Sequence, residues 1–260
     1  MIGIIGGSGL YEIEGVTIRE RRSIQTPFGD PSDAYLIGSF SEEEVVFLPR
    51  HGSQHAIPPH MINYRANIWG FRHLGVERII SIGATGGIDT VMAPGTMVVL
   101  DQIIDMTHGR QATFYDGGTG VVHIDLTEPY CPELRHALAE AGARTGLNPI
   151  RSGTYVCTNG PRLETRAEIE FYSQIGASVV GMTGMPEAAL SREAEICYAG
   201  IAVVTNYAAG ITGKKLTSAE VIEMMNRASL HLKVLLRESF GLIPKERNCP
   251  CKTALKDAGI

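Results

Sequence analysis

The sequence predicts an α/β fold in which helices pack on both faces of a mainly parallel or mixed sheet. Short apolar runs alternate along the chain with segments of helical periodicity, which is the pattern of such folds. With 260 residues, of which 44% are hydrophobic and 20% charged, the chain can bury the core of one large domain. We expect this domain over residues 1–241, followed by a separable C-terminal tail over residues 242–260.

Strands are expected where a short apolar run is bounded by glycine, proline or polar residues. The first such run starts the chain without a cationic segment before it, so we expect a strand there and not a signal peptide. The expected strands are residues 2–5, 45–48, 78–82, 97–104, 153–157, 178–182 and 201–205.

Helices are expected where apolar residues recur every three to four positions. The clearest covers residues 218–238, because Thr217 and Glu220 form a capping-box pattern at its start. Residues 107–120, rich in Gly, Thr and Asp, are expected to form a long surface loop. The other expected helices are residues 63–74, 132–143, 162–175 and 185–195.

The overall charge and the cysteine content limit the classes of partner and compartment. A net charge of −5 and a pI near 5.9 provide no basic surface, which argues against nucleic acid and anionic membranes as partners. No apolar stretch is long enough to span a bilayer. Five cysteines, mostly within apolar segments, indicate a reducing cytoplasm and not a secreted disulfide framework.

Two loops that follow expected strands carry groups suited to an anion. Gly6-Gly7-Ser8-Gly9 lets backbone N–H groups approach a phosphate, and Arg50 and His51 add donors after the second strand. Each loop also has an explanation without a functional role: a tight turn for the glycine loop, and a surface Arg-His pair for the second loop. The glycine turn lacks the third glycine and the distal acid of a dinucleotide fingerprint.

Metal and hydrolase chemistry have no matching motif in the sequence. No expected helix carries His-x-x-x-His with an intervening acid, and no Cys-x-x-Cys occurs. His51 and His55 have the four-residue spacing, but Pro49 and Pro58 disfavour the helix that would align them. Ser8 lacks the Gly-x-Ser-x-Gly elbow of hydrolases. We therefore expect neither a structural zinc nor a catalytic metal.

Polar groups also stand at the ends of later strands and the starts of later helices. They are the carboxylate of Glu164, the thioether of Met182, the hydroxyl of Thr183 and the carboxamide of Asn206. An open α/β sheet keeps its ligand at such positions. This set of groups suits a purine nucleoside.

Five motifs follow one another along the chain: Gly6-Gly7-Ser8-Gly9, Pro49-Arg50-His51-Gly52, Asn63-Tyr64-Arg65-Ala66-Asn67-Ile68-Trp69, Gly160-Pro161-Arg162 and Met182-Thr183-x-x-Pro186-Glu187. In this order they resemble the purine nucleoside phosphorylase and methylthioadenosine phosphorylase family, from Met1 to about Gly241. The resemblance implies a three-layer α/β/α sandwich with a mixed central sheet, assembled as a homotrimer or as a hexamer of two trimers. It implies purine salvage by phosphorolysis, with phosphate as co-substrate and no organic cofactor or metal.

Carried over by position, the resemblance implies roles for individual residues. Met182 would contact the ribose, and His123 would reach from one subunit into the active site of its neighbour. The implied contacts to the base are Glu164 and Asn206 as the catalytic pair, with Leu163, Tyr207 and Ala208 beside them. The implied phosphate site, with Arg50 as its only cation, is Ser8, Arg50, His51, the backbone of Gly83 and Ala84, and Thr183.

Two departures from the methylthioadenosine branch favour a 6-oxopurine substrate. Asn206 stands where that branch carries aspartate, and Glu164 where it carries serine. A carboxylate accepts the N1–H of a 6-oxopurine, while an amide donates to O6 and accepts from a protonated N7. Ala208 replaces a second acid of the adenine-specific branch, which agrees with this reading. The structural alternatives are a turn residue for Asn206 and a first-turn helix acid for Glu164.

The 5′ group of the substrate stays open. Ala219, at the start of the last helix, is small and apolar where nucleoside-specific relatives carry a histidine. Inosine and guanosine are the first expected substrates, giving free base and ribose 1-phosphate, with 5′-methylthioinosine or 5′-methylthioadenosine as the alternative. A dinucleotide-dependent oxidoreductase and a purine-binding protein without catalysis are the alternatives from other classes.

The tail segment Cys249-Pro250-Cys251 resembles a Cys-x-Cys element near the C-terminus of some thermophilic relatives. A disulfide within it would close a small, strained and easily reduced ring. The alternative is a pair of free thiols on a mobile tail.

Overall fold

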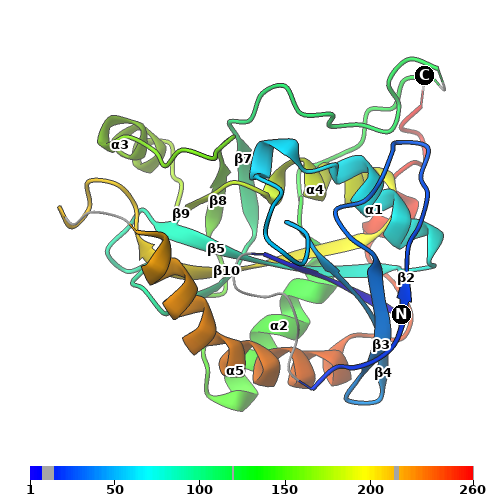
Figure 1. The fold of residues 1–260 in the computed structure, drawn as a ribbon, viewed down its shortest axis with the longest axis horizontal. Coiled ribbons are helices and arrows are strands. Elements are labelled where there is room, and N and C mark those ends of the chain that lie inside the picture. The colour runs from blue at the N-terminus through cyan, green and yellow to red at the C-terminus, as the bar shows by residue number, and fades with distance from the viewer. Residues whose placement is uncertain (8–14, 119, 214–216, 260) are drawn as a thin grey trace.

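The computed structural model describes residues 1–7, 15–118, 120–213 and 217–259. Within these ranges a ten-stranded sheet is covered by helices on both faces, so the expected three-layer α/β/α sandwich is confirmed (Figure 1). The strands are β1 (Ile2–Gly6), β2 (Thr17–Arg22), β3 (Tyr35–Phe40), β4 (Glu43–Pro49), β5 (Arg78–Gly87), β6 (Met97–Val99), β7 (Gln102–Asp105), β8 (Thr154–Cys157), β9 (Val179–Gly181) and β10 (Cys197–Tyr207).

Helices form the two outer layers. In Figure 1, α2 and α5 lie below the sheet and α1 and α4 above it, while α3 packs on β8 and β9 at one end. None of the described helices is long and apolar enough to cross a membrane. The helices are α1 (Tyr64–His73), α2 (Pro132–Thr145), α3 (Arg166–Gln174), α4 (Gly184–Glu193) and α5 (Ser218–Leu242), with the 3-10 helices η1 (Pro59–Met61) and η2 (Pro250–Thr253).

The sheet is mixed, in the order β2-β3-β4-β1-β5-β9-β8-β7, with β10 joining β5 to β6. β1, β4, β5 and β10 run parallel, and β7, β8 and β9 are parallel to one another. β9 is antiparallel to β5. The two parallel groups therefore meet at β5.

One side of β5 is interrupted at this meeting point. β10 pairs with β5 along its whole length, from Arg78 to Gly87. On the other side β1 pairs with residues 78–82, and β9 pairs only with Gly86 and Gly87. No strand in the described part of the chain pairs with residues 83–85 on that side. The backbone N–H and C=O groups of these residues that point to that side are left for a ligand, as at the switch point of an open α/β sheet.

The structure corrects two expected elements. The strand expected over residues 97–104 is divided, because β6 pairs antiparallel with β10 whereas β7 pairs parallel with β8. The helix expected from residue 162 begins at Arg166, since the Thr165 hydroxyl accepts from the Glu168 N–H and the Glu168 side chain returns a bond to the Thr165 N–H. β2 and β3 were not expected, and every residue of β2 is exposed, so it carries no apolar pattern.

The C-terminal segment packs onto the domain. Cys249 and Cys251 are buried in the apolar cluster formed by α2, α5 and β10. The Asn248 N–H donates to Glu133 Oε1 at 2.8 Å, which ties the segment to α2. Both cysteines are free thiols. The expectation of free thiols is therefore confirmed and the disulfide between them is not formed, but the two cysteines are buried against the domain and do not lie on an unpacked tail.

Candidate active site

A cavity of about 750 Å³ opens beside the interrupted side of β5, and this volume suits a small-molecule ligand. Its walls come from the ends of five strands, from the loops around residues 55–59 and 161–164, and from the start of α5. The structure brings together at this cavity ten of the residues expected in the site: Arg50, His51, Gly83, Ala84, Leu163, Glu164, Met182, Thr183, Asn206 and Ala208.

Arg50 is held in a buried ion pair. Its Nε and Nη2 donate to the two carboxylate oxygens of Glu187 at 2.5 and 3.1 Å, and Nη2 also donates to Ser81 Oγ at 2.6 Å. The two side chains are 1% and 0% exposed. Burial acts to lower the pKa of Arg50, but the charge of Glu187 and its hydrogen bond outweigh this and raise the pKa. Glu187 thus neutralises the cation that was expected to face the phosphate.

A donor on Arg50 is left for the cavity. Beyond the bonds to Glu187 and Ser81, Nη1 donates to Ile82 O at 3.3 Å, so the described bonds use four of the roughly five N–H groups of a guanidinium. A Cβ added to Gly7 would lie 2.9 Å from Nη1. Glycine at this position therefore keeps the approach to the remaining N–H open.

His51 is neutral and carries its proton on Nδ1. Nδ1 lies 2.8 Å from Ile57 O, and a carbonyl only accepts, so Nε2 keeps a lone pair. Burial, and after it the charge of Arg50, lower the pKa of His51 to about 4. At neutral pH the free ring nitrogen accepts hydrogen bonds, which corrects the donor role expected from the sequence.

Further donors lie at the free segment of β5, residues 83–85, which have no strand partner on one side in the described part of the chain. Gly83 and Ala84 line the cavity there, and Thr183 faces them from the start of α4: its Oγ1 would be 3.9 Å from a Cβ on Gly83. The Thr183 hydroxyl makes no capping bond to α4, so the helix backbone does not fix its oxygen, and a hydroxyl can rotate to donate its hydrogen to a ligand. Backbone N–H groups and a hydroxyl of this kind hold an anion without a net positive charge.

Glu164 supplies a carboxylate to the same cavity. The Thr158 hydroxyl donates to Glu164 Oε1 at 2.8 Å, which fixes the side chain. Burial raises the pKa of Glu164, and the bond from Thr158 opposes this in part. Glu164 precedes α3 and stands outside it, so the alternative of a first-turn helix acid does not apply. Oε2 makes none of the described hydrogen bonds and can accept from a ligand.

Asn206 presents both a donor and an acceptor. The pairing of β10 with β5 shifts register between Val204 and Asn206, and such a bulge redirects side chains. Asn206 Oδ1 accepts from the Thr205 hydroxyl at 2.8 Å, and Nδ2 donates to Tyr207 O at 2.8 Å. A carboxamide has two N–H groups and two lone pairs on oxygen. One N–H and one lone pair therefore remain for a ligand.

Arg110, which the sequence analysis did not single out, holds the surrounding loops together. It comes from the long loop over residues 107–120 and donates to Met185 O at 2.5 Å and to Met182 O at 2.8 Å. It also donates to Asn159 O at 3.0 Å, and its guanidinium lies 5.1 Å from the centre of the Tyr64 ring. Arg110 is therefore a positioning residue for Met182, and no motif around it indicates this.

Comparison with known proteins identifies the family. The sequence pattern of the Phosphorylase superfamily matches residues 1–240. The chain belongs to the Phosphorylase superfamily. The expected family and the expected enzyme class, a transferase of the nucleoside phosphorylase type, are confirmed.

Individual relatives are similar to this phosphorylase in sequence or structure along nearly its whole length. It is 53% identical to the 6-oxopurine nucleoside phosphorylase of Pyrococcus furiosus, covering 99% of this chain and 98% of that one. It is also 53% identical to the probable S-methyl-5′-thioinosine phosphorylase of Thermodesulfovibrio yellowstonii, covering 100% and 97%. The solved structure of methylthioadenosine phosphorylase from Schistosoma mansoni with adenine superposes with a TM-score of 0.93 at 33% identity, covering 99% and 98%.

Three expected site residues, Tyr207, His123 and Ala219, do not line the cavity of this phosphorylase. A fourth, Ser8, lies outside the described residues. The Tyr207 hydroxyl donates to Thr90 O at 3.2 Å instead, because alternate side chains of β10 point to opposite faces. His123 is exposed on a loop away from the cavity. Ala219 is exposed, and its helical neighbours Ser218, Val221 and Ile222 line the cavity in its place.

The ion pair of Arg50 predicts a large cost for removing its partner. Glu187→Ala should lower the free energy of unfolding by about 3–5 kcal/mol, because a buried guanidinium is left without a counter-charge. Urea unfolding followed by circular dichroism measures this. Glu44→Ala is the control, since Glu44 pairs with Arg19 at 49% exposure, and should cost about 1 kcal/mol or less. Equal losses in the two variants would contradict the assigned role.

The low pKa of His51 predicts a loss of stability in acid. An unfolded histidine titrates near pH 6.5 and folded His51 at about 4, so the unfolded state binds more protons between these values. This part of the stability is complete above pH 6.5 and is lost as the pH falls toward 4, on the order of 3 kcal/mol. His51→Gln should remove that dependence, measured by urea unfolding across this range. His231→Gln, at an exposed site, should not, and identical profiles for both variants would contradict the assignment.

Proposed function

We propose that this phosphorylase cleaves 6-oxopurine nucleosides, inosine and guanosine, with inorganic phosphate. The observation that supports this is the presence of the Glu164 carboxylate and the Asn206 amide in one cavity. A 6-oxopurine presents an N1–H donor and an O6 acceptor, which these two groups complement. Adenine presents a lone pair at N1 and an amine at C6, so it would meet Glu164 with acceptor against acceptor.

The reaction follows from where charge develops. An oxygen of phosphate forms a bond to C1′ of the ribose while the bond from C1′ to N9 of the purine breaks. The sugar becomes oxocarbenium-like and the purine takes up the electron pair, which a proton at N7 then neutralises. Asn206 would stabilise this charge at O6 and N7, while the free segment of β5 and Thr183 would hold the phosphate below C1′.

The free-energy cost of a mismatched contact supports selection between the two bases. A mismatch that leaves a buried polar group unpaired costs about 1–3 kcal/mol. Glu164 is half-buried and fixed by Thr158, and Asn206 is already fixed by Thr205 and Tyr207. Neither side chain can turn away cheaply to avoid the wrong base. Two such mismatches together correspond to a preference on the order of a hundredfold or more.

Exchange of the two base contacts tests the proposal. Asn206→Asp with Glu164→Ser should weaken phosphorolysis of inosine and shift the kcat/KM ratio toward adenosine. Each single change should shift the ratio less, since the remaining residue still disfavours adenine, and the two effects need not add because both residues contact one ring. The measurement is steady-state phosphorolysis of inosine and adenosine by the four proteins.

A matched control for this series is Glu170→Gln, an exposed carboxylate on α3 near Glu164 that pairs with Arg166. It should keep the wild-type ratio. A wild type that already prefers adenosine, or a double variant that keeps the wild-type ratio, would contradict the proposed base recognition.

The wall at the start of α5 favours 5′-methylthioinosine as a second candidate substrate. Ile57, Pro58, Val221 and Ile222 give this part of the cavity an apolar lining, which suits a thiomethyl group better than a hydroxyl. The base contacts are the same for both nucleosides. The ratio of kcat/KM for 5′-methylthioinosine and inosine decides between them.

We also propose a homotrimer, or a hexamer of two trimers, in which His123 completes the active site of a neighbouring subunit. Exposure of His123 and of Val121, which is 52% exposed, supports an interface at this loop. Light scattering at micromolar concentration should give the mass of a trimer or hexamer, and a fully active monomer would contradict the role of His123. The cytoplasm is the proposed compartment, and the absence of a disulfide among the five cysteines, all of them in the described part of the chain, supports it.

A further inference from the structure

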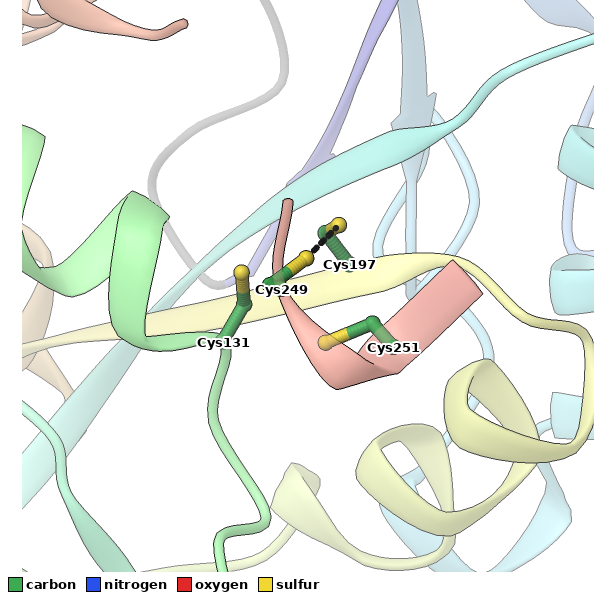
Figure 2. A group of neighbouring side chains, drawn as sticks. All are labelled: Cys131, Cys197, Cys249 and Cys251. Carbon is green, nitrogen blue, oxygen red and sulfur yellow. Dashed lines mark hydrogen bonds between the residues drawn. The ribbon is translucent and has the colours of Figure 1, made fainter. Parts of the chain in front are cut away.

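Four of the five cysteines meet at the N-terminal end of β10. Cys131 immediately precedes α2, Cys197 is the first residue of β10, and Cys249 and Cys251 flank Pro250 in the C-terminal segment. Their Sγ atoms all lie within 4.8 Å of one another, and all four side chains are buried. Figure 2 shows the side chains converging from these three segments.

The spacing of the sulfurs matches a tetrahedral metal site. With zinc–sulfur bonds of about 2.3 Å, neighbouring sulfurs of a tetrahedron are about 3.8 Å apart. Here Sγ of Cys197 and Sγ of Cys249 are 3.3 Å apart, and no pair of the four exceeds 4.8 Å. Pairing into two disulfides needs only two close contacts, whereas a tetrahedral ion brings all four sulfurs equally close. The mutual approach of all four therefore favours one shared ion.

The surroundings can balance the charge of such a site. Four thiolates around a divalent ion carry a net charge of about −2, which is costly in an apolar core unless it is compensated. Cys131 stands at the N-terminus of α2, where the helix dipole favours a thiolate. The N-terminus of α2 thus offsets part of this charge.

We propose that Cys131, Cys197, Cys249 and Cys251 bind one zinc ion in a structural site. Zinc binding displaces one proton from each thiol to solvent and involves no change of oxidation state. Four thiolates complete the coordination sphere and leave no open position for substrate. Cys197 and Asn206 lie at opposite ends of β10, about 30 Å apart at about 3.3 Å per residue. The ion is therefore structural and takes no part in phosphorolysis.

The site explains the packing of the C-terminal segment. The ion links the segment around η2 to the start of α2 and to β10, which are distant in the sequence, and its binding energy becomes folding energy. The expectation of no metal rested on the absence of a helical His-x-x-x-His motif and of Cys-x-x-Cys. A Cys-Pro-Cys pair and two remote cysteines complete the set only in the folded chain.

Metal analysis of the full-length protein tests the inference. The protein is produced with zinc in the medium and purified under reducing conditions. Inductively coupled plasma mass spectrometry should then find about one zinc ion per chain. Cys251→Ser should lose most of this zinc and melt at a lower temperature. Cys157→Ser is the matched control: Cys157 is buried outside the cluster, accepts the Met185 N–H at 3.3 Å, and serine can keep that bond. It should retain the zinc.

A second measurement on the wild type keeps the inference testable if Cys251→Ser does not fold. Replacement of zinc by cobalt should give the visible absorption of a tetrahedral cobalt thiolate, and a mercurial should release the metal as four thiols react. Protein that takes up no zinc after reduction and reconstitution would overturn the inference. So would two disulfides that form again among these four cysteines when the reconstituted protein is returned to buffer without reductant, seen as a mass lower by about 4 Da. Iron at the same stoichiometry would overturn the assignment to zinc.

Discussion

The interruption on one side of β5 is the constraint on which the site depends. β1 leaves β5 at Ile82 and β9 joins it at Gly86, so the residues between them have backbone groups without a strand partner on that side. Buried backbone groups require partners, and a ligand can supply them. β1 and β9 end on either side of residues 83–85 and leave this part of β5 open. The ends of β4 and β10 place Arg50 and Asn206 beside it, in the wall of the cavity.

In the proposed phosphate site, most hydrogen-bond donors are neutral groups, and the charge of the one cation is balanced. Glu187 balances Arg50 deep in the core, and His51 is neutral because burial and Arg50 hold its pKa low. Backbone N–H groups of β5, the Thr183 hydroxyl and one N–H of Arg50 are left as donors. Fixed dipoles of this kind need no reorganisation when charge develops. They can hold an anion locally, although the net charge of the chain is −5.

The sequence predicted what local pattern determines and missed what distant contacts determine. Apolar runs located β1, β5 and β10. The positions of Glu164 and Asn206 at a helix start and a strand end, with the family resemblance, placed both in one site, and both line the cavity. The partner of Arg50 is 137 positions away, so no local pattern reveals that the charge is neutralised. Arg110 acts on backbone carbonyls, which carry no sequence signature. β2 is exposed along its length, and its charged residues therefore gave no strand signal.

The cavity combines the free segment of β5, where we propose that phosphate binds, with the Glu164 carboxylate and the Asn206 amide for the base. We propose that this combination selects 6-oxopurine nucleosides for phosphorolysis. The most direct test is the release of free base by the wild-type enzyme from inosine and from adenosine, each with and without inorganic phosphate. The account predicts release from inosine that requires phosphate, with kcat/KM on the order of a hundredfold above that for adenosine. Release without phosphate, or a preference for adenosine, would contradict it.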